Sequence, residues 1–471
     1  MPPSPRYRPD PRHPSLGDEV FDVVTAARFP TLTLRYRNQR WAARVGLDTL
    51  TDDEWQAHFG RFEPLPDNLA APLALRYHGH QFRTYNPALG DGRGFLFAQL
   101  RDDDDRLLDL ATKGSGQTPW SRGGDGRLTL KGGVREVLAT ELLEALGVPT
   151  SKTFSLFETG EALRRNDEPS PTRASVLVRL GHSHVRFGSF QRLAYLGDRR
   201  TLRALVGYAL AHYAPELCHL DDGDAAPALL RLVIARSARL CAAWMAAGFV
   251  HGVLNTDNLN VTGESFDYGP YRLLPVLDPG FTAAYFDHGG LYAYGAQPEA
   301  VRWALEQLAG ALEVLAPDRD LGRLVAGFEP AYQRALDAAV IARLGLASRG
   351  ALPDRLLRTG VLQLVHDSQL PFERLFFDGY GGAAAAARLA RSPEASAYRG
   401  RAARAVLDEL TAFAPRPTAR LDHPYFADAA PCTLLIDELE ALWAPIATRD
   451  DWAPLEAKLV AIRRMGDALA G

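Results

Sequence analysis

Apolar residues in the first third of the chain follow the alternation of β-strands, with one helical stretch among them. Strand patterns cover residues 95–100, 107–113, 153–157 and 174–180, because successive side chains of a strand point to opposite faces. Between the second and third patterns, Val134, Leu138, Leu142 and Leu146 recur every four residues. This spacing predicts a helix that begins near Leu130 and ends at Gly147.

Polar positions in this part add local detail. The acidic run 102–105 separates two strand patterns, which favours an exposed hairpin turn over a metal site. In the strand 174–180, the apolar side chains at 176, 178 and 180 share one face, so Arg179 points to the other face. On a helical wheel, Glu136 falls at the edge of the apolar stripe of its helix.

Beyond residue 200 the apolar spacing becomes helical. Six apolar residues fit one helical face, which leads through Gly248 into His251; they are Leu230, Val233, Ile234, Leu240, Cys241 and Trp244. A short β segment is expected between 258 and 278. Further helices are predicted at 301–315, 328–345, 355–366, 400–413, 434–446 and 454–469. The alanine run 383–387 fits either a helix or a flexible connection. A β-rich part followed by a helical part is an α+β arrangement typical of the two-lobed protein-kinase fold.

Composition and charge argue against several classes of function. The 471 residues carry 53 basic and 57 acidic side chains, a net charge of −4, so no global field favours nucleic acid or an anionic membrane surface. The cysteines Cys218, Cys241 and Cys432 lack metal-site spacing. With no apolar leader and no long apolar run, we expect a cytoplasmic protein; its oligomeric state cannot be told from the sequence.

The candidate chemistry is concentrated at 251–258, followed nine residues later by Asp267-Tyr-Gly269. Side-chain oxygens such as those of Asn258 and Asp267 suit Mg²⁺, which is usually held by one or two of them together with substrate phosphates. Kinase-type sites use, in order, a strand lysine, a helix glutamate, a metal-binding Asn and a metal-binding Asp. Lys113 and Glu136 complete this order here.

One position departs from the kinase pattern. A kinase places its catalytic Asp five residues before the metal-binding Asn, and here that position is Val253. Valine cannot accept a proton, and the nearby carboxylate is Asp257, directly before Asn258. The sequence therefore does not support the usual transfer of the γ-phosphate.

Several long segments resemble the selenoprotein O pseudokinases. The matching residues lie between about 75 and 305, and they are Tyr77-His-Gly-His-Gln-Phe82, 86–93, Lys113-Gly-Ser-Gly-Gln-Thr-Pro-Trp-Ser-Arg122, Gly124-Asp-Gly-Arg127, Arg135-Glu136, 186–190, His251-Gly-Val-Leu-Asn-Thr-Asp-Asn258, 267–270 and 294–298. The long segments at Lys113 and His251 are highly specific.

The resemblance implies a kinase-like fold that binds ATP in a flipped orientation and transfers AMP to Ser, Thr or Tyr hydroxyls of proteins. Asn258 and Asp267 would hold Mg²⁺, with Mn²⁺ as the alternative, Glu136 would pair with Lys113, and Asp257 would accept the proton. The implied nucleotide contacts are Gly90, Gly92, Arg93, Lys113, Asp125, Gly126, Arg179, Arg186 and Asp267.

The expected organisation has five parts. They are a flexible tail (1–18), an N-terminal extension (19–75), a nucleotide-binding β-rich N-lobe (76–190), a helical C-lobe with the catalytic and metal-binding loops (191–415) and a helical C-terminal extension (416–471). Some family members carry a redox-active Cys or selenocysteine near the C-terminus, which this sequence lacks. An ordinary ATP-dependent kinase for a protein or small molecule, and a nucleotide-binding scaffold without activity, remain the alternatives.

Overall fold

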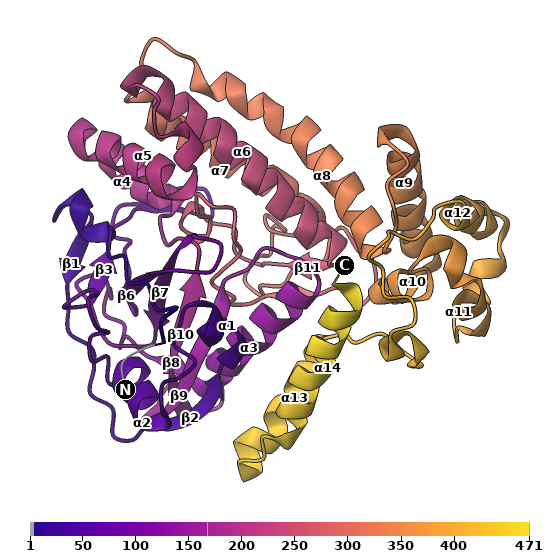
Figure 1. Ribbon diagram of the computed structural model, residues 1–471, viewed down its shortest axis with the longest axis horizontal. Helices are drawn as coiled ribbons and strands as arrows, with labels where there is room; N and C mark the ends of the chain where they lie inside the picture. Colours follow the sequence, from indigo (N-terminus) through magenta and orange to yellow (C-terminus); the bar gives the residue numbers. More distant parts are fainter. Residues whose placement is uncertain (1–3, 167, 471) are drawn as a thin grey trace.

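The computed structural model describes residues 4–166 and 168–470. Its first part is built around a curled antiparallel sheet in the order β1-β3-β6-β7-β10-β9-β2, with β8 also pairing with β10 (Figure 1). The strands are β1 (Phe21–Val23), β2 (Thr33–Arg37), β3 (Leu73–Leu75), β6 (Leu96–Arg101), β7 (Leu107–Lys113), β8 (Leu128–Thr129), β9 (Lys152–Leu163) and β10 (Thr172–Gly181). Two small hairpins, β4 (Gly79–Gln81) with β5 (Thr84–Asn86) and β11 (Phe249–Val250) with β12 (Arg272–Leu273), lie outside this sheet.

The two faces of the sheet carry separate cores. On one face, apolar residues of β6, β7 and β10, including Val176 and Val178, pack with α1 (Gln39–Arg44) and α2 (Asp52–Phe59). The opposite face packs under α3 (Leu130–Ala145). Arg179 lies on this second face, as the alternation predicts.

The helix α3 confirms the prediction from its four-residue spacing. The Thr129 side chain caps its first turn by accepting a hydrogen bond from the Gly132 amide, and Gly147 follows its end with a φ of +77°. Glu136 is buried, with 2% of its surface exposed. The edge of the apolar stripe that carries Glu136 is therefore covered by another part of the protein.

The acidic turn between β6 and β7 is only partly as predicted. Asp103, Asp104 and Asp105 are exposed, but Asp102 is buried. Its carboxylate accepts hydrogen bonds from the Arg106 side chain and from two backbone amides of the turn. The prediction of an exposed turn was therefore wrong for Asp102, whose carboxylate can be buried because these donors satisfy its oxygens.

The second part of the protein is helical, which confirms the predicted change in architecture. Its helices are α4 (Phe187–Tyr195), α5 (Arg199–Tyr213), α6 (Asp222–Ala246), α7 (Gln297–Glu313), α8 (Phe328–Arg343), α9 (Ala351–Ser368), α10 (Phe372–Asp378), α11 (Ala386–Arg391), α12 (Arg401–Thr411), α13 (Ile436–Arg449) and α14 (Ala453–Leu469). The long helices α6, α7 and α8 pack side by side (Figure 1). The alanine run is helical, since it forms a 3-10 turn and the start of α11.

The segment between α6 and α7 contains less β structure than predicted. The hairpin of β11 and β12 is short, and Asn258 belongs to the 3-10 turn Thr256–Asn258 instead of a strand. Most backbone groups here bond within turns and loops. Such a loop can turn several polar side chains towards one point, as a strand could not.

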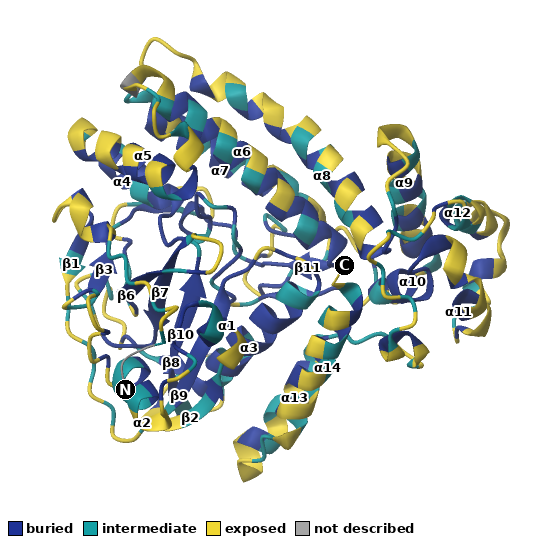
Figure 2. Cartoon of the chain, in the orientation of Figure 1, coloured by how far each residue is buried: buried dark blue, intermediate teal, exposed yellow. Residues whose placement is uncertain are grey.

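The two ends of the chain both pack against the sheet region. Residues 4–18, within the expected tail, include a bridge from Pro9 to Leu100 and the buried side chains of His13 and Leu16. At the other end, α14 lies along α3, and the outward sides of α13 and α14 are exposed (Figures 1 and 2). Among the described residues, none of the helices is long and apolar enough to cross a membrane.

Candidate functional site

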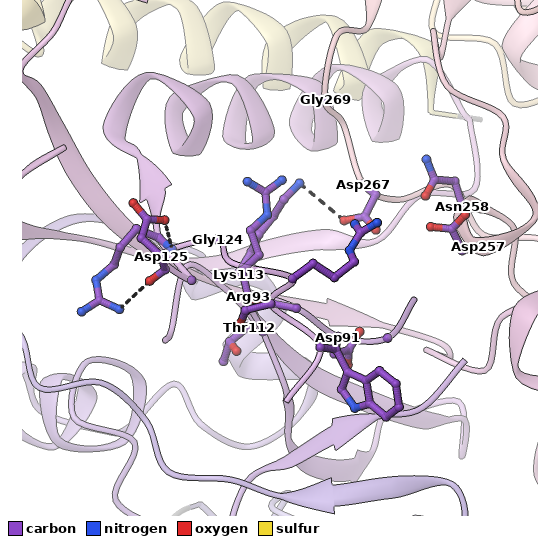
Figure 3. Close-up of a pocket in the computed structure, with 18 of the residues that line it drawn as sticks. Asp91, Arg93, Thr112, Lys113, Gly124, Asp125, Asp257, Asn258, Asp267 and Gly269 are labelled. Atoms are coloured by element: carbon purple, nitrogen blue, oxygen red, sulfur yellow. Dashed lines mark hydrogen bonds and ion pairs between the residues drawn. The ribbon is translucent and has the colours of Figure 1, made fainter. Parts of the chain in front are cut away.

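A cavity of about 740 Å³ lies where the sheet meets the loop between α6 and α7 (Figure 3). Its walls are two glycine-rich segments (90–94 and 123–126), the ends of β7 and β10, and the loop residues between 253 and 270. Every residue predicted to contact the nucleotide or the metal lines this cavity, and so does Asp257. Glu136 lies behind the lining, where it contacts Lys113.

The pair of Lys113 and Glu136 links the sheet to α3. Lys113 is the last residue of β7, and its ammonium group forms an ion pair and hydrogen bond with the Glu136 carboxylate. Both side chains are buried. The same ammonium nitrogen lies 3.4 Å from Oδ1 of Asp267, so Glu136 holds it at the wall of the cavity.

Two arginines share the carboxylate of Asp267. Arg179 donates to Oδ1 at 2.5 Å, and Arg186 donates to Oδ2 at 3.0 Å. Burial alone would raise the pKa of Asp267, but Arg179, Lys113 and Arg186 together hold it well below its usual range. Asp267 is therefore ionised and is the counter-ion of three cations.

Asp257 has a different environment from Asp267. Its side chain is buried, and its Oδ1 has no hydrogen-bond partner among the described residues. Burial raises the pKa of Asp257 to about 6, against the lowering effect of Arg186. A carboxylate with a pKa near neutrality suits the exchange of a proton.

The neighbouring Asn258 is oriented by its backbone surroundings. Its side-chain nitrogen donates to the carbonyl of Val253 at 2.9 Å, which leaves Oδ1 as the amide atom suited to a cation. Val253 also lines the cavity but brings no titratable group there. No cluster of three or more His, Cys, Asp or Glu residues suited to a metal occurs in the described chain. A metal ion held by Asn258 and Asp267 would take its other ligands from a substrate or from water.

The glycine-rich segments bring backbone close to the cavity. A Cβ atom at Gly90 would lie 2.4 Å from the Trp120 ring. Gly126 has a φ of +69°, and a Cβ there would lie 2.2 Å from the carbonyl carbon of Gly116. These segments therefore require glycine, whose backbone can approach a ligand closely.

Arg93 and Asp125 stand at the outer wall of the cavity, and both are exposed. The Asp125 carboxylate forms a bidentate ion pair with Arg165, at 2.7 and 3.0 Å (Figure 3). Asp125 thus presents an already neutralised carboxylate, and Arg165 adds a cation that the sequence analysis did not identify.

Other lining residues were also missed. Asp91 accepts a hydrogen bond from Arg186 at 3.3 Å and lies inside the 86–93 motif, so its position between two glycines was an available signal. Trp120 and Arg122 belong to the Lys113 segment and line the cavity as well. For Arg165, in a polar loop, the sequence offered no signal.

The charge of the lining indicates the ligand class. The cationic side chains are Arg93, Lys113, Arg122, Arg127, Arg165, Arg179 and Arg186, and the carboxylates are Asp91, Asp125, Asp257 and Asp267. Cations are in excess, and arginines together with backbone amides are the usual ligands of phosphate groups. A cavity of this charge, with side-chain oxygens suited to a cation, fits a ligand that carries phosphate groups, such as the nucleotide of a nucleotide-dependent transferase.

Comparisons with known proteins agree with this class. The family model described as protein adenylyltransferase SelO matches residues 6–463. A protein nucleotidyltransferase YdiU from Synechocystis is 43% identical, with 94% of this chain and 95% of the relative covered. YdiU proteins of Gloeobacter violaceus and Synechococcus elongatus are each 44% identical, covering 94% and 98% of this chain and 92% and 96% of the relatives.

This chain therefore belongs to the SelO family of protein adenylyltransferases. The resemblance seen between residues 75 and 305 extends over nearly the whole chain. It includes most of the helical region after residue 415, where none of the quoted motifs lies.

Proposed function

We propose that this protein transfers AMP from Mg-ATP to the hydroxyl groups of Ser, Thr or Tyr side chains of other proteins. The observation that carries the proposal is the position of the carboxylate. Asp257 lies at the cavity wall beside Asn258, and Val253 occupies the place where a kinase has its base. Membership of the SelO family also supports nucleotidyl transfer.

The cations of the cavity are suited to the triphosphate. Arg179, Arg186 and Lys113 now share Asp267 as their counter-ion. Phosphate oxygens would take the place of Asp267 opposite these cations, and its carboxylate would then be available to a metal ion. The binding of nucleotide and the binding of metal are in this way coupled through one residue.

Asn258 and Asp267 would hold the metal ion, Mg²⁺ or alternatively Mn²⁺. Their donor set fits, because both supply oxygen atoms and Asp267 is ionised. When bound, the ion neutralises charge that develops on the phosphate oxygens.

The chemical step requires one proton acceptor. The acceptor hydroxyl oxygen forms a bond to the α-phosphorus, the bond from the α-phosphorus to the bridging oxygen breaks, and pyrophosphate leaves. Asp257 takes the proton of the hydroxyl. Lys113, held by Glu136, contributes positive charge opposite the reacting phosphates.

The proposal also includes a flipped orientation of the bound nucleotide and a division of the chain into two lobes with extensions. In a kinase-like two-lobed fold, 76–190 would be the N-lobe and 191–415 the C-lobe, with 19–75 and 416–471 as extensions. An ATP bound with its α-phosphate near Asp257 accounts for a base next to Asn258. Protein substrates are the partners; neither nucleic acid nor membrane is expected to be one.

Two alternatives lead to different outcomes in one experiment. The protein is incubated with Mg²⁺, unfolded casein as an acceptor, and ATP labelled on either the α- or the γ-phosphate. AMP transfer labels casein only from the α-position, whereas a kinase labels it only from the γ-position. Bound ATP without transfer or pyrophosphate release would indicate a scaffold. Asp267→Ala should abolish labelling, and the exposed-loop variant Asp103→Ala should leave it unchanged.

A further inference from the structure

The C-terminal helices α13 and α14 form a hairpin that reaches the far edge of the sheet. At its tip, Asp450 accepts hydrogen bonds from Arg173 of β10 at 2.6 Å and from Arg35 of β2 at 3.0 Å. Both arginines also contact Glu158 of β9. The tip of the hairpin is thus attached directly to β10 and β2, and through their arginines to β9.

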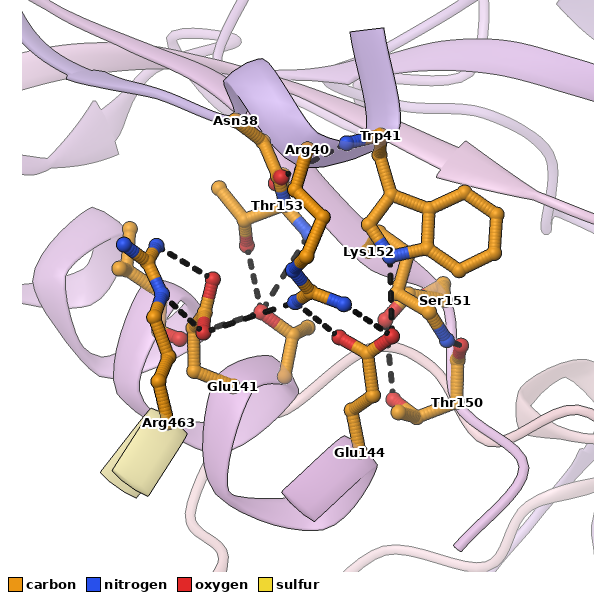
Figure 4. A network of polar contacts seen from close by, with 12 residues as sticks. Asn38, Arg40, Trp41, Glu141, Glu144, Thr150, Ser151, Lys152, Thr153 and Arg463 are labelled. Carbon is orange, nitrogen blue, oxygen red and sulfur yellow. Dashed lines mark hydrogen bonds and ion pairs between the residues drawn. The ribbon is translucent and has the colours of Figure 1, made fainter. Parts of the chain in front are cut away.

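The hairpin also contacts α3 through a buried carboxylate (Figure 4). Arg463 of α14 donates to both oxygens of Glu141 on α3, at 2.9 Å each, and also to the Tyr36 hydroxyl. The Glu141 side chain is 2% exposed. Burial and the Glu141 carboxylate raise the pKa of Tyr36 well above its usual range, so this hydroxyl keeps its proton and donates to Glu141.

Two further contacts attach the hairpin to α3. Lys131, in the first turn of α3, forms an ion pair with Glu440 of α13 at 2.7 Å. Near the other end, a Cβ atom at Gly466 of α14 would lie 3.1 Å from the Cβ of Ala145. The two helices therefore approach each other closely, and α3 is held at its beginning, middle and end.

The same helix supports the cavity with its other side. Glu136 holds Lys113, and Arg135 donates to the carbonyls of Gly269 and Tyr271, at 3.1 Å each. Glu141 is five residues from Glu136, about 7.5 Å along the helix axis. A shift of α3 would therefore move the partner of Lys113 and the turn that follows Asp267 together.

We propose that Arg463 is a positioning residue for AMP transfer. By neutralising the buried Glu141, it holds α3 in the placement in which Glu136 reaches Lys113. Without Arg463, Glu141 would lose its hydrogen-bonded cation and keep only Arg40, at 3.7 Å. A buried carboxylate that loses such a partner is strongly unfavourable, so helix α3 moves to give Glu141 access to water. This inference rests on the proposed function, and it assigns a role to the C-terminal helices.

The chain offers a matched control in the next residue. Arg464 forms a bidentate ion pair with Asp428, at 2.7 and 3.0 Å, and has 40% of its side chain exposed against 44% for Arg463. Both arginines therefore attach α14 by one bidentate pair, but the partner of Arg464 is not on α3. Loss of α14 packing in general would affect both variants alike.

The test compares Arg463→Gln with Arg464→Gln in the full chain. We expect Arg463→Gln to lower kcat for AMP transfer about tenfold, equivalent to about 1.4 kcal/mol. The kcat of Arg464→Gln should stay near that of the wild type. Arg463→Lys, which keeps the positive charge, should have a kcat between those of Arg463→Gln and the wild type. In a Glu136→Gln background, Arg463→Gln should cause a smaller loss than it does in the wild type, because both substitutions act on Lys113. Equal effects of the two arginine variants, or multiplying effects in the double variant, would overturn the proposal.

A second measurement does not depend on the proposed function. Hydrogen exchange of the amides of α3 should be faster in Arg463→Gln than in wild type and unchanged in Arg464→Gln. If the wild type transfers no AMP, the proposed function fails, yet this comparison still tests the role of Arg463. Equal exchange of α3 in both variants would refute the role.

Discussion

Asp267 and Asp257 lie in one cavity but differ in what their removal would reveal. Asp267 forms ion pairs with Arg179, Arg186 and Lys113. Its loss would take from Arg179 its carboxylate partner and weaken the compensation of the other two cations, which would disturb the cavity itself. Asp257 has few partners, and its Oδ1 has none among the described residues. Asp257 is therefore the cleaner test of chemistry.

We predict that Asp257→Asn lowers the single-turnover rate of AMP transfer by about 10²–10⁴-fold, the usual contribution of a general base. Asparagine has nearly the same shape but accepts no proton at this position. The dissociation constant for Mg-ATP, measured by fluorescence titration, should change little. A variant that keeps the wild-type rate would exclude Asp257 as the proton acceptor.

At the scale of elements, the glycine-rich segment 123–126 offers a controlled comparison. Gly123 and Gly126 both have positive φ, so alanine at either costs about 1–2 kcal/mol of backbone strain. Space is open around Gly123, but a Cβ at Gly126 overlaps Gly116. We predict that Gly126→Ala raises the dissociation constant for ATP at least about tenfold and that Gly123→Ala raises it much less. Titration calorimetry measures both constants.

Similar affinities for the two variants would mean that the close contact of Gly126 with Gly116 does not shape the nucleotide site. A thermal unfolding measurement on both proteins provides the control. Both should lose stability through the strain of positive φ, and Gly126→Ala should lose more, because its Cβ also overlaps Gly116.

Elements with clear apolar spacing could be predicted from the sequence. The strands β6 and β7 and the helices α3, α7, α8 and α14 all occur near their predicted positions, because their burial follows the period of the element. The loop between α6 and α7 could not be predicted in this way. Its shape depends on turns and side-chain contacts to distant segments, which leave no period in the sequence.

The residues of the candidate site also differ in whether the sequence could predict them. Lys113, Asn258 and Asp267 stand in motifs, and the structure brings them to one cavity. Arg165 is held at that cavity by its ion pair with Asp125, forty residues away in the sequence. The burial of Glu136 depended on Lys113 across the fold, and a helical wheel contains no such information.

At the scale of the whole molecule, the first residues contribute a buried titratable group. His13 packs against Phe21 and Tyr208, and its backbone amide donates to Gln99. Burial lowers the pKa of His13 to about 4, against the opposing effect of Asp109. The packing of residues 4–18 is therefore linked to pH.

The sign of this linkage follows from the two states. Between pH of about 6.5 and 4, the unfolded chain binds a proton at His13 that the folded chain does not bind. The free energy of unfolding thus falls as the pH falls, by about 1.4 kcal/mol per pH unit for this group. We predict that His13→Gln removes this contribution from the slope measured by urea unfolding at several pH values.

The slope is compared because a substitution at a buried site also changes stability at every pH. An unchanged slope in His13→Gln would show that His13 does not titrate differently in the two states.

The central claim concerns which bond of ATP is broken, and the products of a single reaction show this most directly. The wild-type protein is incubated with Mg-ATP and unfolded casein, the modified side chains are identified by mass spectrometry, and released nucleotide products are separated. We predict adenylyl groups on hydroxyl side chains and an equal amount of pyrophosphate. Phosphoryl groups with release of ADP would contradict the account, as would bound ATP that yields neither product.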